Sequence, residues 1–563
     1  MADGSRSFNF PLPQLSRLQP DEISVDLFAG GGGASQAIKD ATGTDPALAY
    51  NHDEQAIGMH AANHPFTQHH REDIWHADPC VDVAGRRVGW LHFSSDCTHF
   101  SQAKGGQPRS RKIRALSWVG LKWIGQLMAG DKRDGTNTAP RIVSMENVWQ
   151  ILTWGPLVAK RCKVTGRVVK MDGSIAARGE RVPVEHQQLV PDKRHTGRTW
   201  RQFVAALRAK GYEVDWRRID SSHFGAGTDR VRLFLVARRD GQPVSWPTPT
   251  HSGPAALHRT QVAADSIDWD LMGNSIFNRA RPLRPNTIKR LLSGAVRGNW
   301  PQPYLAALEA LRDGVDPVLT VSAEQAEEIA RRFGHRAGLV MATSSGGAAR
   351  DVACRPVPTI TTGGAGSERP GCARPHFVRP IIVHRHNSAG GRGARSVDEP
   401  APTILTGGAG NLAEPIIAPY YGSGSGTTGQ PCSKSLPTVT TKCRFGLAEP
   451  VVVSTCNSSA AGVRLARDPL RTITTAKGGD MAVGEPVLIE YRIDILYRML
   501  VKRELFNAQG FPPNYIIDRT ADGRPISTTA AIRMVGNSVS PPPFRAIVAA
   551  NLDPVAVPMA VAA

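Results

Sequence analysis

The sequence is short of paired cysteines and of long apolar runs. None of its eight cysteines forms a Cys-x-x-Cys pair, which argues against a zinc ribbon, and a dense disulfide scaffold does not suit a chain of 563 residues. No stretch approaches the roughly 18 apolar residues of a membrane span. The first residues show no basic stretch before an apolar core, so we expect no signal peptide. These absences favour a reducing cytoplasm.

Acidic residues are also in deficit. The chain has 49 Asp and Glu residues against 68 Lys and Arg residues, a formal net charge of +19. This excess suits a polyanionic partner, and nucleic acid is the first candidate. A generally charged, soluble surface would have the same composition, so charge alone does not choose between them.

The chain is too long for one typical core, so we expect at least two domains. Short β-branched runs alternate with amphipathic stretches from about residue 21 to 240, which predicts a parallel sheet with helices on both faces. Beyond this part, the composition shifts twice. We expect an N-terminal lead-in (1–20), a catalytic domain (21–245), a linker with helices (246–337), a repeat region (338–490) and a C-terminal segment that returns to the catalytic domain (491–563).

Two short motifs recur in the repeat region. One of them begins at residues 379, 414, 449 and 485, that is, 35, 35 and 36 residues apart, and reads RPIIV, EPIIA, EPVVV and EPVLI. The other reads PTITTGG, PTILTGG, PTVTT and RTITT. Such spacing indicates a duplicated unit, and we expect an all-β array with its loops at one edge. A β-solenoid with a purely structural role remains the alternative. A separate insertion, 154–195, reads as a basic hairpin without assigned chemistry.

Three expected strand ends carry residues suited to a nucleotide-like ligand. The stretch VDLFAGGGGASQAI (25–38) reads as a strand, a glycine turn and a helix start, where backbone can approach a ligand closely. AYNHDEQA (49–56) follows at the next strand end, where a polar side chain can bind a ribose hydroxyl. Asp73 stands at a third. Together they predict a crevice at the carboxyl edge of the sheet.

Cys97, Glu146, Arg230 and Arg232 are the further candidates for chemistry. Each one has an ordinary structural reading as well, since a lone cysteine is usually a small buried hydrophobe and arginines often form surface ion pairs. Arg230 and Arg232 fall on one face of a strand start by alternation.

Taken in order, these motifs resemble those of the cytosine-C5 DNA methyltransferases, over roughly 21–240 and 490–550. The resemblance implies an α/β fold, with a Rossmann-like S-adenosylmethionine-dependent methyltransferase domain and a mainly β target-recognition domain with internal repeats. The matching elements are DLFAGGGG, DI (73–74), the Cys97 loop with FS (100–101), ENV (146–148), DRVR (229–232), RELFNAQGFP (503–512) and GNSV (536–539).

The resemblance also implies roles for individual residues. Cys97 would be the nucleophile that adds to cytosine C6, Glu146 would act at N3, and Arg232 would hold O2 with Arg230 close by. We expect no metal. The cofactor would be S-adenosyl-L-methionine, and the expected cofactor-binding residues are Phe28, Ala29, Gly30, Gly32, Asn51, His52, Asp73, Ile74, Asn537 and Ser538.

Three positions depart from the family pattern. Asn51 replaces a glutamate that usually grips the ribose, and Thr228 replaces a glutamine. The usual Pro-Pro-Cys-Gln reads Ser95-Asp96-Cys97-Thr98, and a carboxylate turned toward the thiolate would raise its pKa. We expect Asp96 to point away.

The expected partner is double-stranded DNA, from which the target cytosine must be flipped, with the repeats reading the sequence. Lys104, Arg109, Arg111 and Lys112 suit a loop that closes on DNA. Alternatives are a tRNA methyltransferase, a catalytically silent DNA-binding relative, and an enzyme that transfers another group. We expect a monomer in the cytoplasm of a bacterial or phage-infected cell, with no membrane association and with a restriction endonuclease as a conceivable partner.

Overall fold

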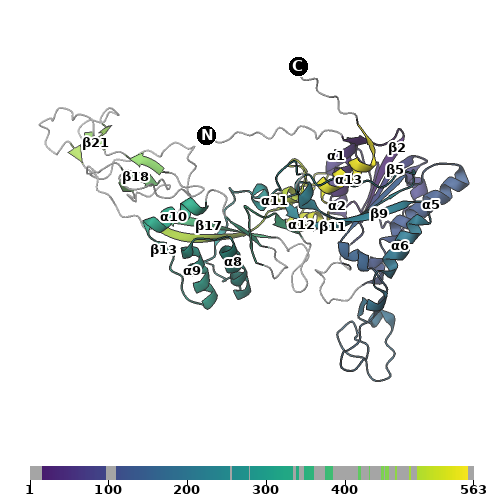
Figure 1. Cartoon of the computed structure of the whole chain (residues 1–563), viewed down its shortest axis with the longest axis horizontal. Helices are drawn as coiled ribbons and strands as arrows, with labels where there is room; N and C mark the ends of the chain where they lie inside the picture. Colours follow the sequence, from purple (N-terminus) through teal and green to yellow (C-terminus); the bar gives the residue numbers. More distant parts are fainter. Residues whose placement is uncertain are drawn as a thin grey trace, which may run out of the picture.

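The computed structural model describes most of the chain outside the repeats (Figure 1). The described residues are 15–96, 100, 110–253, 256–277, 279–333, 338–341, 348–360, 375–384 and 491–555, together with strand residues 416–419, 430–431, 445–448, 451–454, 463–465 and 481–482. Cys97 and most of the repeat region lie outside them. No helix in these ranges is long and apolar enough to cross a membrane.

A seven-stranded sheet forms the larger lobe, with the strand order β4-β3-β2-β5-β6-β11-β9. The first five strands of this order run parallel, while β11 is antiparallel to both of its neighbours. The expected α/β fold is therefore confirmed, and the sheet is mixed, with five parallel strands and an antiparallel β11. The strands are β2 (Glu22–Leu27), β3 (Leu48–Tyr50), β4 (Gln68–His70), β5 (Arg87–Phe93), β6 (Ile142–Asn147), β9 (Glu213–Asp220) and β11 (Val231–Arg238).

Helices cover both faces of this sheet, because its strands are apolar on both sides. Along β6, Ile142 packs into the cluster under α1 and α13, while Val143 and Met145 pack toward α5 and α6. In Figure 1, α1 and α13 lie together, and α5 and α6 stand at the right. The helices are α1 (Gly33–Thr42), α2 (Glu54–Asn63), α3 (Pro79–Val83), α4 (Arg111–Arg114), α5 (Trp118–Asp134), α6 (Arg198–Arg208) and α13 (Pro541–Asn551).

The second lobe is built on a smaller antiparallel sheet with the order β12-β24-β17-β14-β15, to which β13 adds by pairing with β24. One face packs against α8 and α9, and the other against α7, α11 and α12. The elements are α7 (Ala263–Ser266), β12 (Asn274–Ser275), α8 (Pro285–Arg297), α9 (Gln302–Asp313), β13 (Thr320–Val321), α10 (Ala323–Phe333), β14 (Leu339–Met341), β15 (Arg350–Asp351), β17 (His376–His384), β24 (Tyr491–Met499), α11 (Lys502–Gln509) and α12 (Thr528–Asn537).

This sheet takes strands from three of the expected segments. β12 and β13 come from 246–337, β14, β15 and β17 from 338–490, and β24 from 491–563. The helices expected in 246–337 are present, but they pack on the sheet instead of forming a bare connection. The C-terminal segment first completes the second lobe and only then returns, through α11 and α12, to the larger one.

The regular elements among the described residues of the repeat region are all strands. Three copies of the recurring Pro-aliphatic motif fall in or at β17, β18 and β21, which belong to three different sheets, whereas 485–489 lies outside the described residues. The expected all-β array with its loops at one edge stays a prediction, because most of the region lies outside the described residues. The small strands are β16 (Val357–Pro358), β18 (Ile416–Pro419), β19 (Gln430–Pro431), β20 (Phe445–Ala448), β21 (Val451–Ser454), β22 (Val463–Leu465) and β23 (Met481–Ala482).

The 154–195 insertion is a hairpin, as expected. Its stem pairs β7 (Leu157–Ala159) antiparallel with β8 (Leu189–Pro191), and isolated bridges continue beyond it, such as that between Lys170 and Gln187. It projects from the large lobe below α6 in Figure 1. The remaining short elements are β1 (Ser16–Arg17), paired with β25 (Asp553–Pro554), and β10 (Thr228–Asp229), paired with β16.

Candidate functional site

The candidate site lies where the strand order of the large sheet reverses, between β2 and β5. Crevices at such switch points, outside the carboxyl ends of the strands, are where open α/β sheets bind ligands. The glycine loop (28–32) leaves the end of β2, and the loop that carries Cys97 leaves the end of β5. Because these strands pair in parallel, both loops leave from the same edge of the sheet.

The glycine loop turns sharply at its first residue. Phe28 has φ 63, a left-handed conformation that is strained for an aromatic residue. Ala29 donates its N–H to the carbonyl of Tyr50, and Gly32 donates to Ala29, so the loop is fastened to β3 and closes on itself. A Cβ atom on Gly30 would meet only the Phe28 carbonyl oxygen, at 3.8 Å, which leaves space beside the loop.

Two of the glycines are needed for close packing on the protein side. A Cβ atom on Gly32 would lie 2.2 Å from the Tyr515 hydroxyl, and one on Gly33 would lie 2.1 Å from Ser538 Oγ. The C-terminal segment therefore presses directly on the loop and on the first turn of α1. Gly32 is therefore needed because the Tyr515 side chain packs directly against its backbone.

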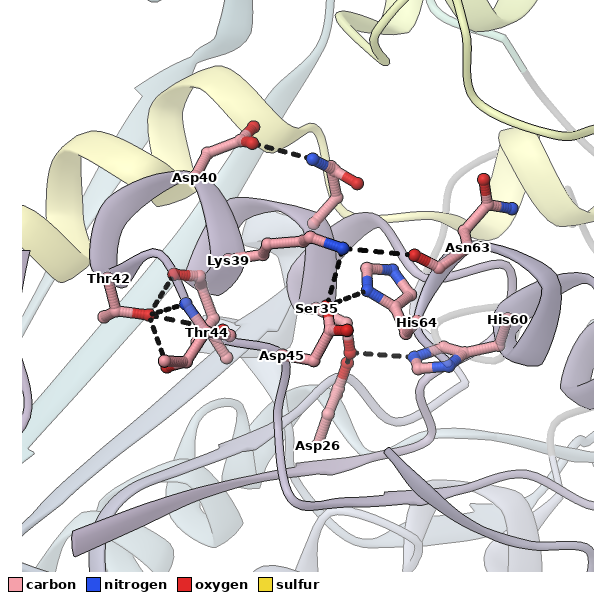
Figure 2. Close-up of polar contacts among 12 residues, drawn as sticks. Asp26, Ser35, Lys39, Asp40, Thr42, Thr44, Asp45, His60, Asn63 and His64 are labelled. Atoms are coloured by element: carbon pink, nitrogen blue, oxygen red, sulfur yellow. Dashed lines mark hydrogen bonds and ion pairs between the residues drawn. The ribbon is translucent and has the colours of Figure 1, made fainter. Parts of the chain in front are cut away.

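A buried chain of hydrogen bonds runs beneath the loop (Figure 2). Ser35 donates to Asp26 Oδ2 at 2.7 Å, and its Oγ lies 2.8 Å from His60 Nε2. His60 Nδ1 lies 2.8 Å from His69 Nε2. Burial lowers the pKa of His60, so the ring is neutral. Because the Ser35 hydroxyl already donates to Asp26, its oxygen accepts a hydrogen bond from His60 Nε2. His60 Nδ1 then accepts from His69. Burial raises the pKa of Asp26 to about 7.

A second buried chain holds the loop from the other side. His64 Nδ1 lies 2.9 Å from Asp45 Oδ1, and His64 Nε2 lies 3.3 Å from the Tyr515 hydroxyl. Tyr515 donates to the carbonyl of Gly31 at 2.7 Å. These residues were absent from the expected site. The paired histidines in QAIGMHAANH, four residues apart on α2, were the only local signal.

The residues at the second and third strand ends differ in exposure. Asn51 is half-buried and accepts the Asp53 backbone N–H at 2.8 Å, which closes the turn before α2, and His52 is exposed. Asp73 is exposed just after β4, and Ile74 beside it is buried. The Asp73 carboxylate accepts the Trp75 backbone N–H at 3.2 Å through Oδ1, so both side chains close their own turns, and Asp73 is the more exposed of the two.

Hydrogen bonds hold the base of the Cys97 loop, although Cys97 itself, with residues 98–99 and 101–109, lies outside the described residues. Asn147 donates to the Ser95 carbonyl at 3.0 Å, and Ser95 Oγ lies 2.8 Å from Ser117 Oγ. Asp96 is exposed. Asn147 was not an expected site residue. The only hint in the sequence is that it is a second polar residue directly after Glu146.

Glu146 and Arg232 are brought together at the carboxyl end of β6. Glu146 is 5% exposed, and its Oε1 lies 3.1 Å from Arg232 Nε. Burial raises the pKa of the Glu146 carboxyl, and Arg232 and then Arg230 pull in the opposite direction. A carboxyl group so placed can hold a proton and donate it to a ring nitrogen.

Arg230 is directed differently from Arg232. It is 1% exposed and donates to the carbonyls of Gly536 at 3.0 Å and Ser538 at 2.7 Å. Its guanidinium therefore ties the GNSV turn to the sheet, which indicates a positioning role. Asn537 in this turn is exposed, and Ser538 is buried.

Thr228 connects the site to the repeat region. It is fully buried and donates its hydroxyl to the Val357 carbonyl at 2.9 Å, where β10 and β16 run in parallel. Thr359, in the first PTITTGG copy, donates to the Asp229 carbonyl. The first repeat unit is thereby paired with the DRVR segment.

One group of three potential metal ligands occurs among the described residues, at the same edge of the sheet. Donor atoms of His70, Glu72 and Asp82 lie within 4.8 Å of one another. His70 stacks on Tyr50, with ring centroids 4.4 Å apart, and Asp82 accepts the Tyr50 hydroxyl at 2.6 Å. Packing at the strand end accounts for these contacts.

Comparison with known proteins gives one family match. The model of the C-5 cytosine-specific DNA methylase family matches residues 23–155 and 188–293. No curated protein matches the sequence.

Solved structures with some likeness have low identity. A prophage-encoded protein of E. coli, described as a DNA modification methyltransferase, is 12% identical with a TM-score of 0.40, covering 94% of this chain and 97% of that one. The Dnmt2 methyltransferase of S. pombe is 10% identical with a TM-score of 0.37, with the same coverages. A mutant DNMT2 of Spodoptera frugiperda is 15% identical with a TM-score of 0.30, covering 48% and 66%.

The assignment therefore rests on the family match and on the motifs that the fold brings to one edge of the sheet. The matched residues include the glycine loop, Cys97, Glu146 and both arginines. Over these residues the chain matches the C-5 cytosine-specific DNA methylase family.

Proposed function

We propose that this methyltransferase flips a cytosine out of duplex DNA and transfers a methyl group to its C5 atom at specific sequences. The observation that carries the proposal is the buried Glu146 carboxyl, 3.1 Å from Arg232, beside the strand whose end leads to Cys97. An acid, a cation and a thiol on neighbouring strand ends match the needs of addition to a pyrimidine ring.

Members of this family use S-adenosylmethionine, and the residues present fit it. The exposed Asp73 carboxylate can accept from the adenine amino group, the space beside Gly30 admits a ligand, and Phe28 offers an aromatic face. Asn51 offers the ribose an uncharged amide. When bound, the cofactor supplies an electrophilic methyl group.

Each of the proposed catalytic side chains acts at a different atom of the base. The Cys97 thiolate adds to C6, which makes C5 nucleophilic, while Glu146 donates a proton or hydrogen bond at N3. Arg232 pairs with O2 and steadies Glu146. After methyl transfer, loss of the C5 proton expels the Cys97 thiolate. A site that excludes water strengthens these charge interactions.

Transfer of tritiated methyl groups to duplex DNA and to tRNA tests the proposal. The wild-type chain is expected to label duplex DNA, and Cys97→Ser to abolish transfer and the denaturation-stable adduct with 5-fluorocytosine duplexes. Glu146→Gln should lower kcat by roughly 10²–10³-fold, the scale of losing one preorganised partner, with duplex binding retained.

Glu213→Gln serves as the matched control, because Glu213 is exposed at the opposite edge of the sheet. If only tRNA is labelled, the substrate is tRNA and the DNA proposal is wrong. If Cys97→Ser still forms the adduct, Cys97 is not the nucleophile.

A further inference from the structure

Most of the hairpin between Glu146 and α6, residues 156–187, lies outside the family match. The family model aligns up to residue 155 and resumes at 188, so the projecting part is an addition to the shared fold. The chain enters it ten residues after the end of β6, from the edge of the sheet that holds the candidate site. A segment placed there stands beside any substrate bound at that edge.

The root of the hairpin is packed against the nucleophile loop. The rings of Trp154 and Phe100 meet edge to face, with centroids 5.6 Å apart, and Phe100 is three residues beyond Cys97. Arg111, at the far end of that loop, donates to the Leu157 carbonyl at 3.4 Å. Both ends of the loop thus contact the hairpin stem.

The neck of the hairpin is closed and rigid. Asp192 donates its N–H to the Pro156 carbonyl at 3.0 Å, and Trp200 donates to Trp154 at 3.1 Å. A Cβ atom on Gly155 would lie 2.3 Å from the His195 carbonyl oxygen, so the two sides touch through backbone. The hairpin therefore holds a fixed direction relative to the site.

The hairpin surface is strongly basic. Residues 157–195 contain nine Lys and Arg and four Asp and Glu, a net charge of +5, with the cations at 160, 161, 163, 167, 170, 178, 181, 193 and 194. Lys170 pairs with Glu180 at 2.5 Å. Within the described chain, Lys163, Arg178 and Arg181 are exposed and have no ion-pair partner. Unpaired cations on a rigid projection complement a row of phosphates.

Apolar side chains are exposed between these cations. Val164 is 93% exposed, and Met171 is 52% exposed. Apolar side chains exposed to water do not stabilise the protein. In a complex with nucleic acid, they can pack against sugars and in the grooves.

We infer that the 157–195 hairpin is a second DNA-binding element, which contacts the phosphate backbone of the duplex flanking the target cytosine. This inference rests on the proposed duplex substrate. In Figure 1 the hairpin and helices α8 and α9 project to the same, lower side of the molecule. Backbone contacts of this kind position the enzyme without adding sequence preference.

The double variant Lys163→Gln/Arg178→Gln tests the inference by fluorescence anisotropy with a labelled duplex at several salt concentrations. The expected result is roughly 5–20-fold weaker binding to specific and unrelated duplexes alike, and a salt slope reduced by about 2, one for each lost phosphate contact. The kcat at saturating duplex should be unchanged. The control is Lys132→Gln/Lys210→Gln, which removes two cations at the amino edge of the sheet.

Duplexes trimmed on either side of the target cytosine locate the contact. The difference in duplex affinity between the wild type and the double variant should vanish when one particular flank is removed. Equal binding by the hairpin and control variants would overturn the inference, as would weaker binding to tRNA with duplex binding unchanged. Binding needs no methyl transfer, so a wild-type chain that fails to methylate DNA would refute the proposed function while the hairpin is still tested.

Discussion

At the scale of single residues, the two buried carboxyl groups near the site serve different purposes. Glu146 forms an ion pair with Arg232, whereas Asp26 lies at 0% exposure beneath the glycine loop with Ser35 as its donor. Burial raises the pKa of both, because a charge without water is costly. For Glu146 this shift suits the proton donation proposed above. For Asp26 it is a cost in stability.

The stability of the protein should therefore depend on pH through Asp26. Its pKa of about 7 in the folded chain exceeds the ordinary value of 3.8, so the folded state keeps a proton that the unfolded state has lost. Stability from this group falls as pH rises from about 4 to about 7, by roughly 2–4 kcal/mol. Asp26→Asn should remove that fall.

Urea unfolding at pH 5, 6, 7 and 8 measures the effect. The difference in unfolding free energy between Asp26→Asn and wild type should move in favour of the variant as pH rises. The exposed Asp21, in Asp21→Asn, is the control, and a difference that is flat with pH would contradict the assignment.

At the scale of elements, the glycine loop depends on segments far away in the chain. The Tyr515 hydroxyl, from the turn after α11, holds the Gly31 carbonyl and contacts His64 of α2. The GNSV turn after α12 rests on Gly33 and is tied down by Arg230. Three segments that are distant in the sequence therefore meet at the glycine loop. The C-terminal stretch returns to the large lobe and supplies two of them.

Tyr515→Phe should loosen this joint. Loss of one buried hydrogen bond costs about 0.5–1.5 kcal/mol, so cofactor affinity in calorimetry should fall roughly 3–10-fold. Tyr212→Phe is the matched control: Tyr212 is buried and donates to the Pro140 carbonyl at 2.6 Å at the opposite edge of the sheet. It should lose similar stability and keep its cofactor affinity. If both variants bind the cofactor alike, the network does not support the site.

At the scale of the whole molecule, the two lobes are joined through the site. The pairing of β10 with β16 places the first repeat unit against the DRVR segment, and Arg350 forms an ion pair with Asp229 at 2.6 Å. α11 and α12 pack with α2 and with the second sheet in one core. The region proposed to read DNA sequence is therefore in direct contact with Thr228 and Asp229, just before the strand that carries Arg232.

Replacing 384–393 with a Gly/Ser loop tests that proposal, with methylated cytosines mapped genome-wide by bisulfite sequencing. If the loop contacts base edges, one position of the recognition site should relax, by roughly 1–3 kcal/mol. Loss of phosphate contacts alone would lower the yield at all sites equally. An unchanged context and an unchanged yield would favour the structural reading of the repeats.

The sequence alone indicated the α/β sheet, the glycine loop, the family resemblance and the separate site candidates Glu146 and Arg232. These follow from local signals, since strand period, turn glycines and motif order are all written in neighbouring residues. The basic hairpin was visible for the same reason.

Only the tertiary structure decided what Arg230, Thr228 and Tyr515 do. Arg230 binds carbonyls more than 300 residues away, as its contact with Gly536 shows, and β24 pairs with β17 across the repeats. Such contacts depend on which surfaces meet after the chain has closed loops of that length. No local period or turn records that choice, because the backbone carbonyls that accept Arg230 are present at every residue.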